Sequence, residues 1–121
     1  MRLAARLAVG LLAASLTLVG CGDGTFGVDK ETQAPATYAY VIPIGAGQAL
    51  DAGTPLEILP ARLDASVGEV LEIVNDDERG HTIGPFFVGA YETMRIEFTE
   101  SGRFEGGCTV HPSGEIVIVV T

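Results

Sequence analysis

The chain has 121 residues, with 16 acidic side chains against 7 basic ones, a formal net charge of −9 and 47% hydrophobic residues. That length allows one small domain. Proteins that bind nucleic acid through its phosphates need a basic surface, so the charge excludes that class. Two cysteines are too few for a disulfide-rich scaffold.

The N-terminus predicts an exported chain. Arginines at positions 2 and 6 precede an apolar run of about a dozen residues, which is typical of a secretory signal peptide and too short to span a membrane. The run ends Leu18-Val19-Gly20-Cys21, which resembles the lipobox of bacterial lipoproteins. The resemblance implies that residues 1–20 are removed and that Cys21 is acylated. Acyl chains would then hold the chain on the periplasmic or outer side of a cell-envelope membrane. The alternative is an ordinary signal peptide with a chance cysteine.

Loss of residues 1–20 removes Arg2 and Arg6 and changes the net charge from −9 to −11. An acidic body is repelled by an anionic membrane surface, so its membrane association must come from the lipid. Residues 21–36 are expected to be the lipidated cysteine and a flexible linker, because they are rich in Gly, Asp, Thr and Pro and lack periodicity. Residues 37–121 are expected to form the domain.

From Tyr38 onward the sequence predicts an all-β domain. Short apolar runs, several of them alternating apolar and polar residues, are typical of half-buried strands. Glycines and prolines separate these runs, and no window of a dozen residues has a helical stripe. A β-sandwich or barrel is therefore expected. The predicted strands are residues 38–42, 56–59, 62–65, 70–74, 94–98 and 116–120.

Three side chains in this domain are candidate metal ligands. The chain has only two histidines, His81 and His111, and Cys108 is the one thiol left after lipidation of Cys21. One thiolate and two imidazoles are the ligand set of a blue-copper centre, which normally adds a weak axial methionine. A structural zinc site needs four ligands. A Cys108–His111 nucleophile pair, as in thiol hydrolases, and histidines with no metal role both remain open.

Residues 56–121 resemble the cupredoxin family, most closely its amicyanin/plastocyanin-like branch. Residues 59–63 and 67–76 resemble a strand pair of that family, and His81-Thr82 resembles its first ligand motif. Residues 98–104 resemble the motif that precedes the second ligand group, Cys108-Thr109-Val110-His111-Pro112. The resemblance implies a Greek-key β-sandwich and one type 1 copper ion. It implies His81, Cys108 and His111 as equatorial ligands, with Asn75, Thr109 and Pro112 as supporting residues around them.

The sequence departs from this family at the axial ligand. The loop after His111 is shorter than the family's and contains no methionine. The only methionine left after signal cleavage is Met94, at the start of an earlier strand. The axial position is either empty or filled by Glu115 or the Gly80 carbonyl.

The resemblance implies a one-electron carrier at the cell envelope that meets its redox protein partner transiently. The acidic residues Asp76, Asp77 and Glu78 would attract a basic partner. We expect a monomer, and no enzyme activity, because one copper ion without a second centre or a substrate pocket leaves little chemistry beyond electron transfer. Two alternatives stay open: an envelope protein that binds and delivers exchangeable copper, and a metal-free interaction module on a cupredoxin scaffold.

Overall fold

The structure is a computed structural model that describes residues 27–121. The predicted signal peptide, the predicted lipidation site Cys21 and the first part of the predicted linker lie outside the described residues. Within residues 27–121, no helix is long and apolar enough to cross a membrane.

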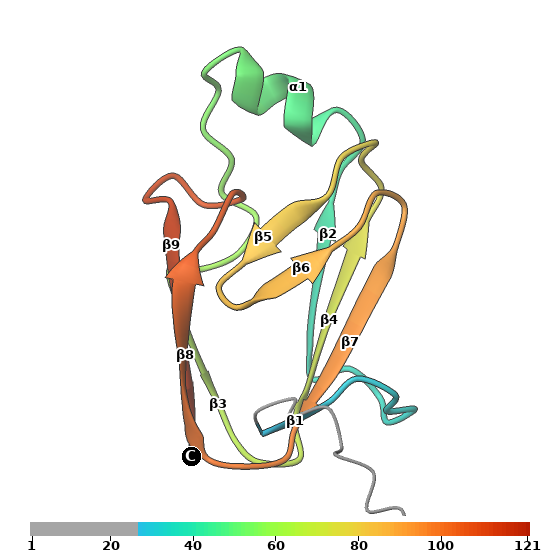
Figure 1. Cartoon of the computed structure of the whole chain (residues 1–121), viewed down its shortest axis with the longest axis vertical. Coiled ribbons are helices and arrows are strands. Elements are labelled where there is room, and N and C mark those ends of the chain that lie inside the picture. Colours follow the sequence, from blue (N-terminus) through green and yellow to red (C-terminus); the bar gives the residue numbers. More distant parts are fainter. Residues whose placement is uncertain (1–26) are drawn as a thin grey trace, which may run out of the picture.

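Two β-sheets face each other and enclose the core (Figure 1). The first sheet has the strand order β1-β7-β4-β2, and the second has the order β3-β9-β8. The prediction of an all-β sandwich is confirmed. Residue bounds in the first sheet are Val28–Asp29 for β1, Tyr38–Ile42 for β2, Val70–Asn75 for β4 and Thr93–Phe98 for β7. In the second sheet they are Arg62–Ala65 for β3, Gly102–Gly107 for β8 and Glu115–Val120 for β9.

Alternation along the strands accounts for the core. In β4 and β7, Ile73 and Ile96 are fully buried, and Ile118 of β9 meets them from the opposite sheet as part of the same apolar cluster. Side chains two residues apart point to the same face of a strand, so one face of each sheet becomes apolar. The pairs β2–β4 and β3–β9 are parallel, whereas β4–β7 and β8–β9 are antiparallel.

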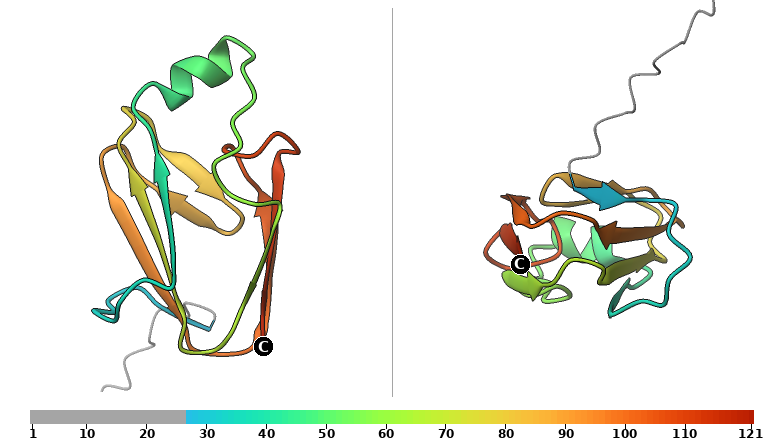
Figure 2. Two further views of the ribbon diagram at one scale, coloured as in Figure 1. Left: turned by 180° about the vertical axis from the view of Figure 1, so that it is seen from behind. Right: turned by 90° about the horizontal axis from the view of Figure 1, so that it is seen from below.

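A hairpin and a helix occupy one end of the sandwich. The hairpin consists of β5 (His81–Ile83) and β6 (Phe86–Val88), and the helix is α1 (Ala46–Asp51). Figures 1 and 2 show α1 at the end opposite the C-terminus, above the loop that joins β8 to β9. The candidate ligands lie at this end of the molecule.

Two local predictions differ from the structure. Residues 56–59 were expected to form a strand, but they form an irregular connection in which Leu59 is buried. Pro55 and Pro60 flank this run. Because proline has no backbone N–H to donate, a hydrogen-bonded β-ladder cannot extend through either end of the run. The helix α1 was not predicted, because its six residues are too few to show a helical stripe.

The predicted linker also differs from the structure over residues 27–36. Val28 is buried, and β1 pairs with β7, Val28 opposite Phe98. The Thr32 hydroxyl donates to Glu97 Oε2 at 2.6 Å, and Arg95 donates to the Ala34 carbonyl. These partners are more than sixty residues away in the chain, so a local composition rich in turn-forming residues did not reveal them. The folded domain therefore begins before Thr37.

Candidate metal centre

The segment that carries His81 lies directly against the segment that carries Cys108. Ile83 of β5 forms an antiparallel bridge with Cys108. The Thr109 N–H donates to the Thr82 carbonyl at 3.0 Å, and the Gly84 N–H donates to the Gly107 carbonyl at 2.7 Å. Backbone hydrogen bonds therefore connect two of the predicted ligand segments, which are far apart in sequence.

Cys108 begins a tight turn at the end of β8. Its side chain is buried, with 2% of the residue exposed, and its N–H donates to the Gly114 carbonyl at 2.8 Å. Burial raises the pKa of the Cys108 thiol, although a hydrogen bond from the Val110 backbone N–H opposes the shift. A thiol with a raised pKa is a poor nucleophile at neutral pH. This environment disfavours the Cys108–His111 nucleophile pair.

His81 is buried between a carboxylate and a hydroxyl. Its Nε2 lies 2.9 Å from Asp77 Oδ2, and its Nδ1 lies 3.2 Å from Thr109 Oγ1. Desolvation would raise the pKa of the buried Asp77. Hydrogen bonds from His81 and from the backbone N–H groups of Gly47, Glu78 and Gly45 nevertheless hold that pKa below its ordinary value. The Asp77 carboxylate is therefore an ionised acceptor that lies against the buried His81 ring.

His111 lies at the surface end of the same turn. Its Nδ1 accepts a hydrogen bond from the Ser113 N–H at 3.1 Å and lies 2.7 Å from Ser113 Oγ. The ring is half-buried. An open hollow of about 460 Å³ brings His111 together with Cys108, and its lining is completed by Leu50, Thr82, Gly107, Thr109 and Gly114.

Within residues 27–121, no group of three or more His, Cys, Asp or Glu side chains is already placed to hold a metal ion. The donor chemistry of His81, Cys108 and His111 nevertheless fits copper: one thiol and two imidazoles, of which His111 accepts a hydrogen bond at Nδ1 and His81 has its Nδ1 beside the Thr109 hydroxyl. Metal binding at Nδ1 would require the contact between His81 and Thr109 and the contact between His111 and Ser113 to break.

The predicted supporting residues have different positions. Thr109 contacts His81 and Thr82, so it links the two ligand segments. Asn75 is buried and shapes the loop before His81: its amide donates to the Arg79 and Gly89 carbonyls, and its oxygen accepts from the Asp77 N–H. Pro112 is exposed in the turn that contains His111.

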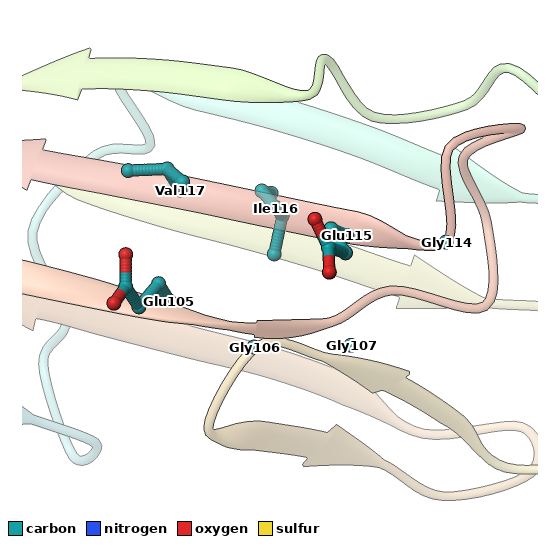
Figure 3. A pocket seen from close by; sticks show the side chains of 7 residues that line it. All are labelled: Glu105, Gly106, Gly107, Gly114, Glu115, Ile116 and Val117. Atoms are coloured by element: carbon teal, nitrogen blue, oxygen red, sulfur yellow. The ribbon is translucent and has the colours of Figure 1, made fainter.

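Neither Glu115 nor Gly80 lines the hollow that Cys108 and His111 share, and the predicted ligand His81 does not line it either. Glu115 is exposed at the start of β9 and lines a second hollow between β8 and β9, together with Glu105 (Figure 3). Gly80 precedes His81 and lies under the Phe87 ring. Met94 is on β7, in register with Ile73 of β4. Its position lines another hollow, beside Phe87 and Arg95.

Asp77 is the site residue that the sequence did not identify. The sequence suggested an acidic loop from Asp76 to Glu78, yet Asp77 is fully buried whereas Asp76 and Glu78 are exposed. The only feature of the sequence that could have pointed to Asp77 as a site residue was its position four residues before His81. Asp77 therefore adds nothing to an acidic surface, and its carboxylate belongs to the surroundings of His81.

No protein-family model and no curated protein matches the chain. Among solved structures, it is similar to amicyanin from Paracoccus versutus, with 16% identity and a TM-score of 0.48 over 78% of this chain and 98% of that one. It is also similar to a purple cupredoxin from Nitrosopumilus maritimus, with 21% identity and a TM-score of 0.44 over 69% of this chain and 99% of that one. These proteins belong to the family that the sequence resembles. At such identities and scores, any metal role must be argued from the side chains of this chain.

Proposed function

We propose that the chain is a copper-binding, cupredoxin-like lipoprotein of the cell envelope that carries one electron at a time. The observation that carries this proposal is the placement of the buried Cys108 thiol. It shares a hollow with His111 and lies on the segment that is hydrogen-bonded to the strand of His81. One thiolate and two imidazoles form the trigonal ligand set of blue-copper sites.

When bound, copper supplies a one-electron couple between its cuprous and cupric states. The residues of the chain would hold the donor atoms and exclude water. His81 and Cys108 are 3% and 2% exposed, so their donor atoms lie largely outside bulk solvent. Hydrogen bonds between β5 and the Cys108 segment limit how far the two donors move apart. Cys108 must lose its proton on metal binding, so copper affinity should fall at low pH.

A titration of the full chain with Cu(II), followed by visible and EPR spectroscopy, tests this function. We expect an intense thiolate-to-copper band that saturates at one copper per chain, and a reversible one-electron couple. A chain that binds no copper, or that binds it without a thiolate band, would contradict the proposed carrier. The absence of binding would favour the metal-free interaction module.

A second candidate is a protein that binds and delivers exchangeable copper. The observation that favours it is the engagement of His81 Nδ1 by Thr109 and of His111 Nδ1 by Ser113. These contacts would form again when copper leaves, and they would stabilise the metal-free state and so assist release. Competition of the loaded chain with a Cu(I) chelator separates the candidates: rapid metal loss favours delivery, whereas retention favours the electron carrier.

The proposed location and partner rest on the sequence and on the surface. We propose anchoring through acylated Cys21 and transient contact, as a monomer, with a basic redox protein. Two exposed acidic residues, Asp76 and Glu78, support attraction of a basic partner. The Phe87 side chain, which is 66% exposed, adds an apolar contact surface. Membrane fractionation of the parent chain and of Cys21→Ser tests the anchor. We expect the parent in the membrane fraction and the variant in the soluble fraction; co-fractionation of both would oppose the proposal.

A further inference from the structure

We propose that Asp77 is a positioning residue for His81, which it holds with the proton on Nε2 and with the Nδ1 lone pair directed toward the Cys108–Thr109 segment. The consequence for copper rests on the proposed function. The orientation and tautomer of His81 belong to the metal-free chain and do not depend on that function.

The His81 ring and backbone N–H groups converge on the Asp77 carboxylate. Oδ2 lies 2.9 Å from His81 Nε2 and accepts from the Gly47 N–H at 2.8 Å, while Oδ1 accepts from the Gly45 N–H at 3.1 Å. The residue is fully buried, so water does not compete for these contacts. Backbone N–H groups can only donate, and they stabilise the ionised carboxylate, which can only accept. The shared proton therefore belongs on His81 Nε2.

With Nε2 occupied, the other ring nitrogen faces the Cys108 segment. His81 Nδ1 lies 3.2 Å from the hydroxyl of Thr109, which follows Cys108 in the chain. A carboxylate that fixes the far nitrogen of a metal-ligating histidine sets its tautomer and ring orientation and makes it a stronger donor. Asp77 would hold His81 in this way before any metal arrives.

The same carboxylate fastens α1 beside the hollow. A β-carbon on Gly47 would lie 2.6 Å from Arg79 Cδ and 2.9 Å from Asp77 Oδ2, so both side chains approach the helix closely at this glycine. Leu50 of α1 lines the hollow with Cys108 and His111. A second attachment of α1 comes from Arg79, which donates to the Gly47 carbonyl at 3.2 Å and pairs with Asp51 at 2.6 Å. The Asp51 carboxylate makes no hydrogen bond to His81 or Asp77, so a change at Asp51 is a control that loosens α1 without removing a contact of His81.

Nitrogen-15 NMR of the histidine rings in the full, metal-free chain tests the inference near pH 7.5. The chain contains only two histidines, which makes assignment direct. In the parent we expect His81 to carry its proton on Nε2 only. In Asp77→Asn we expect a mixture of tautomers. The controls are Asp76→Asn, the same change at the exposed neighbouring position, and Asp51→Asn, which breaks the other attachment of α1; both should keep the parent tautomer.

A proton on Nδ1 in the parent, alone or together with one on Nε2, would overturn the inference, and this measurement needs no folded variant. An unchanged tautomer in Asp77→Asn would overturn it equally.

The copper measurement separates this inference from the proposed function. If both hold, Asp77→Asn should bind copper about 10–100-fold more weakly than Asp76→Asn in chelator competition. A parent that binds no copper, with His81 still protonated on Nε2 under the control of Asp77, contradicts the proposed function and leaves the positioning of His81 supported. Equal copper affinity and equal tautomers in Asp77→Asn and Asp76→Asn contradict the inference and leave the function standing.

Discussion

Thr109 and Thr82 are joined by hydrogen bonds in both directions. The Thr109 N–H donates to the Thr82 carbonyl at 3.0 Å, and the Thr82 N–H donates to the Thr109 hydroxyl oxygen at 3.2 Å. Thr82 follows His81 and Thr109 follows Cys108, so this pair connects the neighbours of two candidate ligands. The relationship exists in the chain without a metal ion.

Replacing Thr109 by valine keeps the branched shape and removes the hydroxyl. The Thr82 N–H and His81 Nδ1 then lose their partner, so we expect the free energy of unfolding to fall by about 1 kcal/mol. Urea denaturation measures the change. Thr99→Val is the control, because the Thr99 hydroxyl is exposed and makes no hydrogen bond with other described residues. Equal stability of the two variants would mean that the Thr109 hydroxyl contributes nothing to the connection.

Gly106→Ala should separate the β5–β6 hairpin from β8. A β-carbon on Gly106 would lie 3.1 Å from the backbone of Gly84, a residue with φ of +57° in the hairpin turn. Backbone cannot move aside as a flexible side chain can, so we expect a loss of about 1–3 kcal/mol in stability. Copper binding should weaken as well, because the same hairpin carries His81.

Gly102→Ala, on the same strand, is the matched control for this change. A β-carbon on Gly102 meets no atom within 4 Å. Thermal or urea denaturation of both variants compares them directly. Similar midpoints for Gly106→Ala and Gly102→Ala would show that the hairpin tolerates the extra carbon.

Cys108→Ser should abolish the thiolate-to-copper absorption of the Cu(II)-loaded chain. Serine occupies nearly the same space but supplies no thiolate, the donor responsible for that band in blue-copper sites. Visible spectroscopy provides the measurement. Cys21→Ser changes the other cysteine of the chain in the same way and should keep the band. A visible band that survives in Cys108→Ser would remove Cys108 from the metal site.

Tyr38→Phe should make the free energy of unfolding less dependent on pH in the acidic range. The Tyr38 hydroxyl donates to Glu69 Oε2 at 2.8 Å. Hydrogen bonds from the Ser66 N–H and from Tyr38 lower the pKa of Glu69. A lowered pKa in the folded state adds stability above the unfolded-state pKa of about 4.3, and this stability is lost as the pH falls through the folded-state value.

Without the Tyr38 hydroxyl, the pKa of Glu69 moves back toward its ordinary value. The variant should therefore be less stable than the parent at neutral pH, and the gap should narrow as the solution is acidified. Denaturation at a series of pH values measures it. Tyr40→Phe, on the same strand, is the control, since the Tyr40 hydroxyl makes no hydrogen bond among the described residues. If the difference in stability between Tyr38→Phe and the parent stays constant with pH, the titration of Glu69 does not cause that difference.

Much of the fold could be predicted from short stretches of sequence. The predicted runs at 62–65, 70–74 and 94–98 fall within the strands β3, β4 and β7. That signal is local, because side-chain direction in a strand repeats every two residues. The six-residue α1 and the β1–β7 pair depend instead on distant partners, Asp77 for the helix and Phe98 for β1. No local pattern carries this information.

The same division applies to the candidate site. The sequence alone predicted the donor set, because the chain has only two histidines and Cys108 is its one cysteine outside the segment that resembles a lipobox. Only the tertiary structure decided what each donor atom contacts. It buries Asp77 against His81 Nε2, engages Nδ1 of His81 with Thr109 and that of His111 with Ser113, and places Glu115 in a different hollow from Cys108. The physical reason is that donor chemistry belongs to each side chain, whereas burial and hydrogen bonding arise from segments that meet only in the folded chain.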